Sequence, residues 1–489
     1  MSTGIENHPT AAYDHGAAFA RLLQVPTVAA DLPKLLQVPV DTGPEVFAAF
    51  RDVLRELFPL VHEKLDLVYP GREAIDSGNI TQDGIDFLSP ESGYDALLWH
   101  WKGKADDKPI VLLAHHDVVP GQALVKMSEE DTGGWTHPPF GGEMEDGKIY
   151  GRGAMDNKNS LYCILRATEE LLVENFVPAQ DVWIGSSDSE EVGGNGAIYI
   201  RDYLTEHGVK PYLVVDEGGT VIDKLFPQMN KPFAMIGVVE KGSGIVKFTA
   251  KSHGGHTSAP PKNTPWERLA RFIVDVHSHN YFPAAVDPLL VETIQSWGGG
   301  LSGLLAFAFK HIKLFKPLLP LVIPKIHPFG VALLHTNITF TMAQGAIVPN
   351  MIPAEAYIGA NIRYAPWQGV EEVNRILQKL CKKYDIEMET MMAYDATGYA
   401  DREGEGYRFL TDTIKEVYPE IGIAPYMMIG GTDGRHFASI CPASLRFSPI
   451  PLTAAQLSTM HGDDENLDVA ALGEGVRFFR AFFRRLPEG

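Results

Sequence analysis

Apolar and polar positions follow two different periods in the first half of the chain. Short runs rich in β-branched residues at 110–114, 182–185 and 212–215 predict strands. Between them, 160–173 and 197–206 repeat apolar residues at helical spacing and predict amphipathic helices. Because strands and helices alternate, the predicted fold class is α/β, with helices covering a sheet on both faces.

A different order of elements begins near residue 241, where a strand, a helix, a long insertion, two strands, a helix and a strand follow one another. This order predicts a smaller α+β domain, whose clearest strands are 245–251, 337–342 and 356–363. The helical pattern at 406–417 and the loops after it then indicate a return to the first domain.

The length of the chain also favours two domains, because 489 residues are too many for one simple core. Its composition, 45% hydrophobic and 21% charged, is that of an ordinary globular protein. We predict an α/β domain formed by residues 1–240 and 397–489, with an α+β domain inserted at 241–396.

Charge and cysteine content exclude several classes of function. A formal net charge of -20 repels phosphate backbones, and no Lys/Arg patch is interleaved with aromatic residues, so nucleic-acid binding is not expected. Cys163, Cys381 and Cys441 are far apart and lack CxxC spacing, which argues against a disulfide framework and against a thiolate metal site. The N-terminus has no basic start followed by an apolar run, so a cytoplasmic location is expected.

Acids and histidines gather where predicted strands run into glycine-rich loops, the part of an open α/β sheet where ligands bind. In LLAHHDVVP, His115 and Asp117 point to the same side of an extended strand, so Asp117 can orient a metal-binding His115. Alone, this pattern also fits a hydrogen-bonded histidine at a strand end. Four further clusters favour a metal site, and they contain Asp156, the pair Glu190 and Glu191, Asp216, and His461.

Gly194, Gly196 and Asp216 also imitate a dinucleotide-binding fingerprint. The imitation fails because SSDSEEV separates the glycines from the strand and the third glycine is missing. The metal-site interpretation explains Asp216 together with the other clusters.

The five clusters, in this order, resemble the aminoacylase and carboxypeptidase family of two-zinc metallopeptidases, and particularly its carboxypeptidase S and N-acyl-amino acid hydrolase members. The resemblance implies a zinc exopeptidase architecture, with an α/β catalytic domain and an inserted lid or dimerisation domain. It also implies that His115 and Asp216 hold one zinc ion, that Glu191 and His461 hold the other, and that Asp156 bridges both.

In such a site Glu190 is expected to be the general base, while its neighbour Glu191 binds metal. Nitrogen and oxygen donors without a thiolate suit zinc, with cobalt or manganese as substitutes. The resemblance further implies a cis peptide bond between Asp156 and Asn157. Ser189 and Asn159 depart from the family's usual residues, which leaves the choice of subfamily open.

The resemblance places substrate recognition in the inserted domain and in one loop of the catalytic domain. His256, in GGHTS, is expected to stabilise the oxyanion in the active site of a second subunit, which implies a homodimer. Arg363 can bind the substrate's carboxylate through two hydrogen bonds, although an interstrand ion pair is the alternative. The residues expected to assist it are Asn350, Gly430, Gly431 and Thr432.

An insertion at about 293–335 is apolar and basic, and no Asp or Glu occurs between residues 293 and 354. Lys310, Lys313 and Lys316 have helical spacing, and Pro317, Pro320, Pro324 and Pro328 are expected to end that helix. We expect a hydrophobic cap that receives an acyl group; the alternatives are packing within the domain or a dimer interface, and peripheral membrane contact through about 303–328.

The function that the resemblance implies is hydrolysis of an amide bond next to a free carboxylate, in N-acyl-amino acids or short peptides, including long or aromatic acyl groups. A dipeptidase is the enzymatic alternative. A catalytically silent metal-binding regulatory protein is the alternative from another class. The presence of Glu190 favours an enzyme, because a silent relative has no need of a general base.

Overall fold

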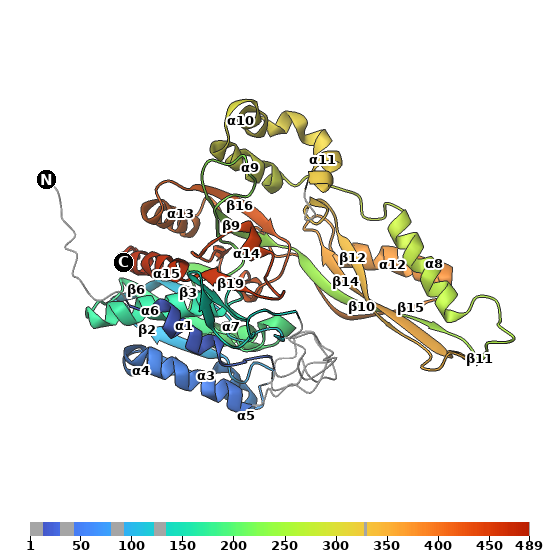
Figure 1. The fold of residues 1–489 in the computed structure, drawn as a ribbon, viewed down its shortest axis with the longest axis horizontal. Helices are drawn as coiled ribbons and strands as arrows, with labels where there is room; N and C mark the ends of the chain where they lie inside the picture. Colours follow the sequence, from blue (N-terminus) through green and yellow to red (C-terminus); the bar gives the residue numbers. More distant parts are fainter. Residues whose placement is uncertain (1–12, 30–43, 80–91, 122–133, 327–329, 489) are drawn as a thin grey trace.

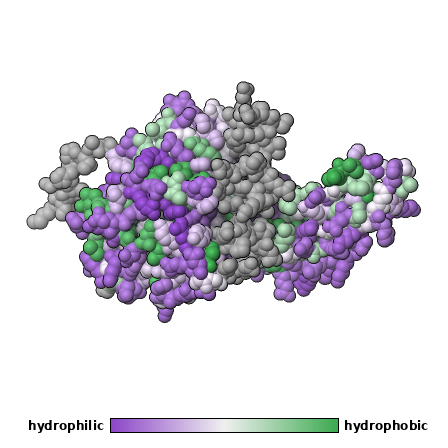
Figure 2. Space-filling model, turned by 90° about the horizontal axis from the view of Figure 1, so that it is seen from below, coloured by the Kyte–Doolittle hydropathy of each residue, from purple (hydrophilic) through white to green (hydrophobic). Residues whose placement is uncertain are grey.

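The computed structural model describes residues 13–29, 44–79, 92–121, 134–326 and 330–488. These residues form a larger lobe that contains both ends of the described chain and a narrower lobe that extends from it (Figure 1). Seen from below, the described surface of both lobes is predominantly hydrophilic (Figure 2), as the high charge of the chain predicts.

A mixed sheet of 10 strands forms the centre of the larger lobe. Its path runs β1-β2-β6-β3-β7-β17-β9-β8-β18, and β16 pairs with β9. The strands β6, β3, β7 and β17 are parallel to one another, so their carboxyl ends lie at one edge. The bounds are β1 (Asp66–Val68), β2 (Leu97–Trp101), β3 (Ala105–Leu113), β6 (Gln180–Ser186), β7 (Leu213–Asp216), β8 (Val221–Ile222), β9 (Phe233–Glu240), β16 (Gly422–Met428), β17 (Ser444–Arg446) and β18 (Pro451–Leu452).

Helices pack on this sheet around one large apolar core, as the predicted α/β class requires. The predicted helices at 160–173 and 197–206 are present as α6 (Lys158–Val173) and α7 (Gly196–Glu206). The others are α1 (His15–Leu23), α3 (Pro44–Leu57), α4 (Pro59–Lys64), α5 (Pro70–Asp76), α13 (Glu405–Val417), α14 (Ala454–Leu457) and α15 (Val469–Arg484). A small sheet of β4 (Glu143–Glu145), β5 (Lys148–Tyr150) and β19 (Asn466–Asp468) lies beside them.

The narrower lobe is the α+β unit that the second pattern predicts. Its four-stranded antiparallel sheet has the order β12-β14-β10-β15, and α8 and α12 pack on that sheet over a separate apolar core. The bounds are β10 (Gly242–Lys251), α8 (Pro265–Ser278), β12 (Asn337–Gln344), β14 (Glu355–Tyr364), α12 (Val370–Tyr384) and β15 (Glu387–Tyr394). At its far tip, β11 (Gly255–His256) pairs with β13 (Met351–Ile352).

The insertion between α8 and β12 packs mainly against the larger lobe. The helix α9 (Pro288–Trp297) lies on β16, and Leu301 joins an apolar cluster with Phe233 of β9. The expected single lysine-bearing helix is wrong, because α10 (Gly303–Lys310) ends at Lys310. A 3-10 helix, η3 (Ile312–Leu318), and then α11 (Leu319–Ile326) follow it.

The prolines do not end the helical segment as expected, since Pro317 lies inside η3 and Pro324 inside α11. Pro328 lies outside the described residues. Among the described helices, each is too short or too polar to cross a membrane.

Candidate metal centre

The carboxyl ends of three neighbouring parallel strands bring the acids and histidines together. His115 follows β3, Glu190 and Glu191 lie in a short 3-10 helix, η1 (Glu190–Val192), after β6, and Glu217 directly follows β7. Because β6, β3 and β7 are adjacent in the sheet, residues about 100 positions apart meet at one edge.

Asp156 lies between two histidines. One of its carboxylate oxygens is 2.8 Å from Nε2 of His115, and the other is 2.8 Å from Nε2 of His461. Asp156 precedes α6, and the peptide bond from Asp156 to Asn157 is cis, as the resemblance implies. A carboxylate that faces two imidazoles through its two oxygens has the arrangement needed to bridge two metal ions.

Two overlapping groups of donor atoms surround His115, and within each group all atoms lie within 4.8 Å of one another. One contains Asp156 and Glu191, and the other contains Glu190 and Glu217. One oxygen of Glu191, Oε1, is buried without a hydrogen-bond partner in the described structure. Because an unpartnered buried carboxylate oxygen is costly, this donor set fits a bound cation.

Electrostatics point in the same direction. Burial raises the pKa of Glu190 and of Glu217 well above the usual range, and it raises the pKa of Glu191 to about 7. Hydrogen bonds to Asp156 and Glu191 raise the pKa of His461 to about 10. Like charges crowded in a buried site are held more favourably when cations lie between them.

The structure differs from the prediction for Asp216. Its carboxylate accepts hydrogen bonds from the backbone N–H of Gly434, at 2.5 Å, and of Glu217, at 2.9 Å. Glu217 Oε1 instead lies 3.1 Å from Nε2 of His115. Consecutive side chains at the end of a strand point to opposite sides, so only one of two adjacent acids reaches the cluster, and here it is Glu217. The DEGG sequence contains this signal, because it offers both acids.

Asp117 holds the acidic pair in place more directly than it holds His115. Its two carboxylate oxygens accept the backbone N–H groups of Glu190 and Glu191 at 3.1 and 3.0 Å. Nδ1 of His115 lies 2.9 Å from the backbone carbonyl oxygen of Asp117 and 3.4 Å from its carboxylate. Residue 117 therefore orients both the histidine and the start of η1, a second role that the HxD pattern does not predict.

Glu465 is a further positioning residue that the sequence interpretation missed. This fully buried carboxylate accepts the backbone N–H of Met155 at 2.7 Å and pairs with Arg152 at 2.6 Å. It therefore fixes the loop that presents Asp156. Its place in MHGDDENL, four residues after His461, was the available signal.

The loop of Gly430, Gly431 and Thr432 follows β16 and is hydrogen-bonded to a buried acid. Glu240 accepts hydrogen bonds from the backbone N–H of Thr432 at 3.1 Å and from its hydroxyl at 2.6 Å. Glu240 also pairs with Arg446, and both side chains are almost completely buried. Thr432 is therefore occupied in holding the loop, while Gly430 and Gly431 form its partly exposed part.

Two cations are candidates for binding a substrate carboxylate. Arg363 lies near the end of β14, opposite Ser243 of β10. Burial and, to a smaller extent, the charge of Arg363 lower the pKa of Lys241, the residue between β9 and β10. Arg435, which the sequence interpretation missed, stacks on Tyr394 with its guanidinium carbon 4.8 Å from the ring centre. Desolvation lowers the pKa of Arg435. The negative charges of neighbouring groups, including Tyr394 and Glu190, raise it by a larger amount, so the net shift of the pKa is upward.

His256 and Asn350 do not join this cluster within one chain. Both are exposed, and they lie at the far tip of the narrower lobe, where Thr257 N–H donates to the carbonyl oxygen of Asn350 at 3.4 Å (Figure 1). Nδ1 of His256 accepts a hydrogen bond from Ser258 N–H at 3.1 Å, so the ring proton is assigned to Nε2.

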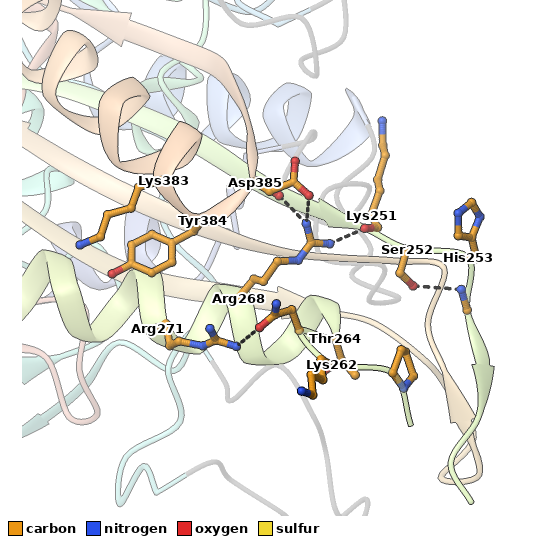
Figure 3. Close-up of a pocket in the computed structure, with 13 residues that line it drawn as sticks. Lys251, Ser252, His253, Lys262, Thr264, Arg268, Arg271, Lys383, Tyr384 and Asp385 are labelled. Carbon is orange, nitrogen blue, oxygen red and sulfur yellow. Dashed lines mark hydrogen bonds and ion pairs between the residues drawn. The ribbon is translucent and has the colours of Figure 1, made fainter. Parts of the chain in front are cut away.

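A pocket of about 580 Å³ lies in the narrower lobe, between the start of α8, the ends of β10 and α12, and His253 (Figure 3). Its lining is basic, but Arg268 is paired with Asp385, and Lys383 with Asp275. It contains none of the acids of the metal cluster, so the chemistry is assigned to the cluster and not to this pocket.

Comparison with known proteins agrees with this geometry. The model of peptidase family M20/M25/M40 matches residues 111–485. The chain is 34% identical to the N-fatty-acyl-amino acid synthase/hydrolase PM20D1 of Bos taurus, over 77% of this chain and 74% of that protein. It is 30% identical to the probable carboxypeptidase S-like 2 of Dictyostelium discoideum, over 88% of this chain and 78% of that protein.

Solved structures share the fold. Human carnosine dipeptidase 1 superimposes with a TM-score of 0.64 at 14% identity, covering 96% of this chain and 95% of that one. The M20 family metallo-carboxypeptidase Sso-CP2 of Sulfolobus solfataricus gives 0.63 at 17% identity, covering 96% and 99%. The chain therefore belongs to peptidase family M20/M25/M40, and it is a metallohydrolase of the carboxypeptidase and N-acyl-amino acid hydrolase type.

Proposed function

We propose that this protein hydrolyses N-acyl-amino acids at a centre of two zinc ions bridged by Asp156, with Glu190 as the general base. The observation that carries the proposal is the position of Asp156, whose two oxygens face His115 and His461 at 2.8 Å each. Glu190 lies beside this bridge, in the donor group that also contains His115 and Glu217.

The first ion would be held by His115 and Glu217, and the second by His461 and Glu191, with Asp156 shared. Three carboxylates and two imidazoles suit zinc, with cobalt or manganese as substitutes. When bound, zinc supplies a Lewis acid and lowers the pKa of the attacking water.

Glu190 removes a proton from the attacking water and delivers it to the leaving nitrogen. Its backbone N–H is anchored on Asp117, which keeps the side chain on the side of the cluster that faces His115 and Glu217. A base placed on a short, anchored helix needs little reorganisation during the reaction.

A homodimer completes the proposed site. His256 presents an Nε2–H donor at the exposed tip of the narrower lobe. From there it does not contact the metal cluster of its own chain. In a second copy of the chain that donor can reach the substrate's oxyanion, as the resemblance implies. The strand β12 lies at an edge of the four-stranded sheet of the narrower lobe and is largely exposed, so it supplies a surface through which two copies can pair.

The proposed substrates carry a free carboxylate and a fatty-acyl group. The cations Arg363 and Arg435 support a substrate with a free carboxylate. The name of the PM20D1 relatives, N-fatty-acyl-amino acid synthase/hydrolase, supports a fatty-acyl group. Each buried methylene of an acyl chain adds about 0.8 kcal/mol to binding. The kcat/KM should therefore rise with acyl length until further methylenes no longer contact the protein.

A hydrolysis series tests this proposal. Zinc-loaded protein is incubated with N-acetyl-, N-octanoyl- and N-lauroyl-phenylalanine and with a phenylalanine dipeptide, and release of phenylalanine is measured by mass spectrometry. The Glu190→Gln variant controls for contaminating enzymes. Rising kcat/KM along the series supports a fatty-acyl substrate. A flat series contradicts it, and preference for the dipeptide would make the protein a dipeptidase.

A further inference from the structure

The helical segment at residues 303–326, formed by α10, η3 and α11, has an inner face that is already filled. Ile312 and Leu319 are buried in an apolar cluster with Leu290 and Ile294 of α9. The segment lies at the upper end of the molecule, beyond β9 and β16 (Figure 1). The apolar residues needed to hold it on the protein are therefore accounted for.

A second set of large apolar side chains on the same segment faces solvent. The exposed fractions are 83% for Leu304, 56% for Phe307, 75% for Leu314, 52% for Leu318 and 66% for Leu321. These residues recur through all three helical pieces, so the exposure is a property of the whole outer face. An apolar face of this kind on a soluble lobe marks a contact with something outside the chain.

The charge of this segment is opposite in sign to the net charge of the protein. Lys310, Lys313, Lys316 and Lys325 are exposed, and within the described part of the chain none of them forms an ion pair. No acid occurs between residues 293 and 354, in a chain whose net charge is -20. A partner of negative charge is therefore favoured.

We propose that residues 303–326 dock this protein onto the surface of an anionic lipid membrane. Leucine and phenylalanine side chains would enter the boundary of the acyl chains, while the lysines bind lipid phosphates, as in amphipathic segments that lie in the plane of a membrane. A second copy of the chain fits less well, because a twofold contact through this face brings lysines against lysines with no acid from the segment between them. The inference does not depend on the proposed substrate.

Vesicle sedimentation tests the proposal. The zinc-loaded protein should bind vesicles made of equal parts phosphatidylcholine and phosphatidylglycerol, and it should bind pure phosphatidylcholine vesicles much more weakly. Replacing Lys310, Lys313 and Lys316 with Gln should lower the partition coefficient about 100-fold. The matched control replaces the exposed lysines Lys210, Lys379 and Lys382 with Gln and should leave binding unchanged.

The apolar part is tested with Leu304→Ser, Leu314→Ser and Leu321→Ser, each of which should lower partitioning by up to about 10-fold. The exposed valines of α6 and α8 supply the control pair, Val173→Ser and Val274→Ser. Hydrolysis of a short soluble substrate and the Tm should stay at the wild-type values, which shows that the variants are folded.

Three results would overturn the proposal. The first is that the wild-type protein does not bind the anionic vesicles, and the second is that the segment variants bind as well as their controls do. The third is that the leucine variants turn a wild-type dimer into a monomer on light scattering, because this face is then an interface between copies.

Discussion

The carboxylates of Asp216 and Glu217, adjacent at the end of β7, serve different neighbours. Glu217 reaches Nε2 of His115 at 3.1 Å, whereas Asp216 accepts the backbone N–H of Gly434 at 2.5 Å. We therefore expect Glu217→Gln to lower zinc affinity about 100-fold or more, because a charged ligand is lost. Asp216→Asn keeps an acceptor for Gly434 and should lower zinc affinity by about 10-fold at most. Metal content after dialysis measures the difference, and the reverse order would restore Asp216 as the ligand.

Glu190 and Glu191 form a second adjacent pair, for which we propose separate roles. Glu190→Gln should keep both metal ions and lower kcat about 1000-fold, because only proton transfer is removed. Glu191→Ala and His461→Ala should lose metal. Metal analysis combined with kcat separates these outcomes, and a near-normal kcat for Glu190→Gln would show that another residue is the base.

The exposed position of His256 predicts complementation between two inactive variants. In the proposed homodimer, Glu190→Gln and His256→Ala should each have low kcat when expressed alone. Coexpressed, they form mixed dimers in which one site has both an intact Glu190 and an intact His256 from the other copy, so activity should return to about a quarter of wild type. Activity that stays at the level of the separate variants would show that His256 does not act across subunits.

Arg363 and Arg435 can be separated with substrates that have or lack the carboxylate. Loss of the cation that binds the carboxylate should raise KM about 100-fold for the acid and little for the corresponding amide. We expect Arg363→Ala to show this selective rise in KM. If Arg435→Ala shows it instead, Arg435 is the cation that binds the carboxylate. Arg271→Ala, an exposed position on α8, is the control. Equal losses on acid and amide would remove a residue from the recognition role.

Glu191 and His461 should stabilise the metal-free protein less as pH rises from 5 to 9. Burial raises the folded-state pKa of Glu191 to about 7, and hydrogen bonds to carboxylates raise that of His461 to about 10. A pKa that is higher in the folded state stabilises below the unfolded value and loses this stabilisation as pH passes through the folded value. The stabilisation contributed by Glu191 and that contributed by His461 are therefore both lost as pH rises, and the two losses add.

Melting curves in the presence of a chelator measure this effect, and zinc-loaded protein is the control because bound cations replace the protons. A difference between the Tm of zinc-loaded and of metal-free protein that stays constant or narrows between pH 5 and 9 would contradict the electrostatic account of the cluster.

Local patterns in the sequence predicted most of the elements and four of the five proposed metal ligands. The predicted strand 110–114 lies almost entirely in β3, and the helix 160–173 lies within α6. His115 and His461 are among the predicted residues that meet at Asp156. These predictions succeed because strand and helix periods are local, and because acids placed after buried parallel strands converge at one edge of the sheet.

The tertiary structure decided what depends on packing between distant segments. Whether Asp216 or Glu217 points at His115 follows from how β7 sits in the sheet, and neither residue type alone reveals it. Likewise, the insertion packs on β9 and β16, and His256 stands at a tip that its own cluster does not use. Sequence alone determined which groups are available for metal chemistry, whereas the direction in which each side chain points was set by long-range contacts that no local period encodes.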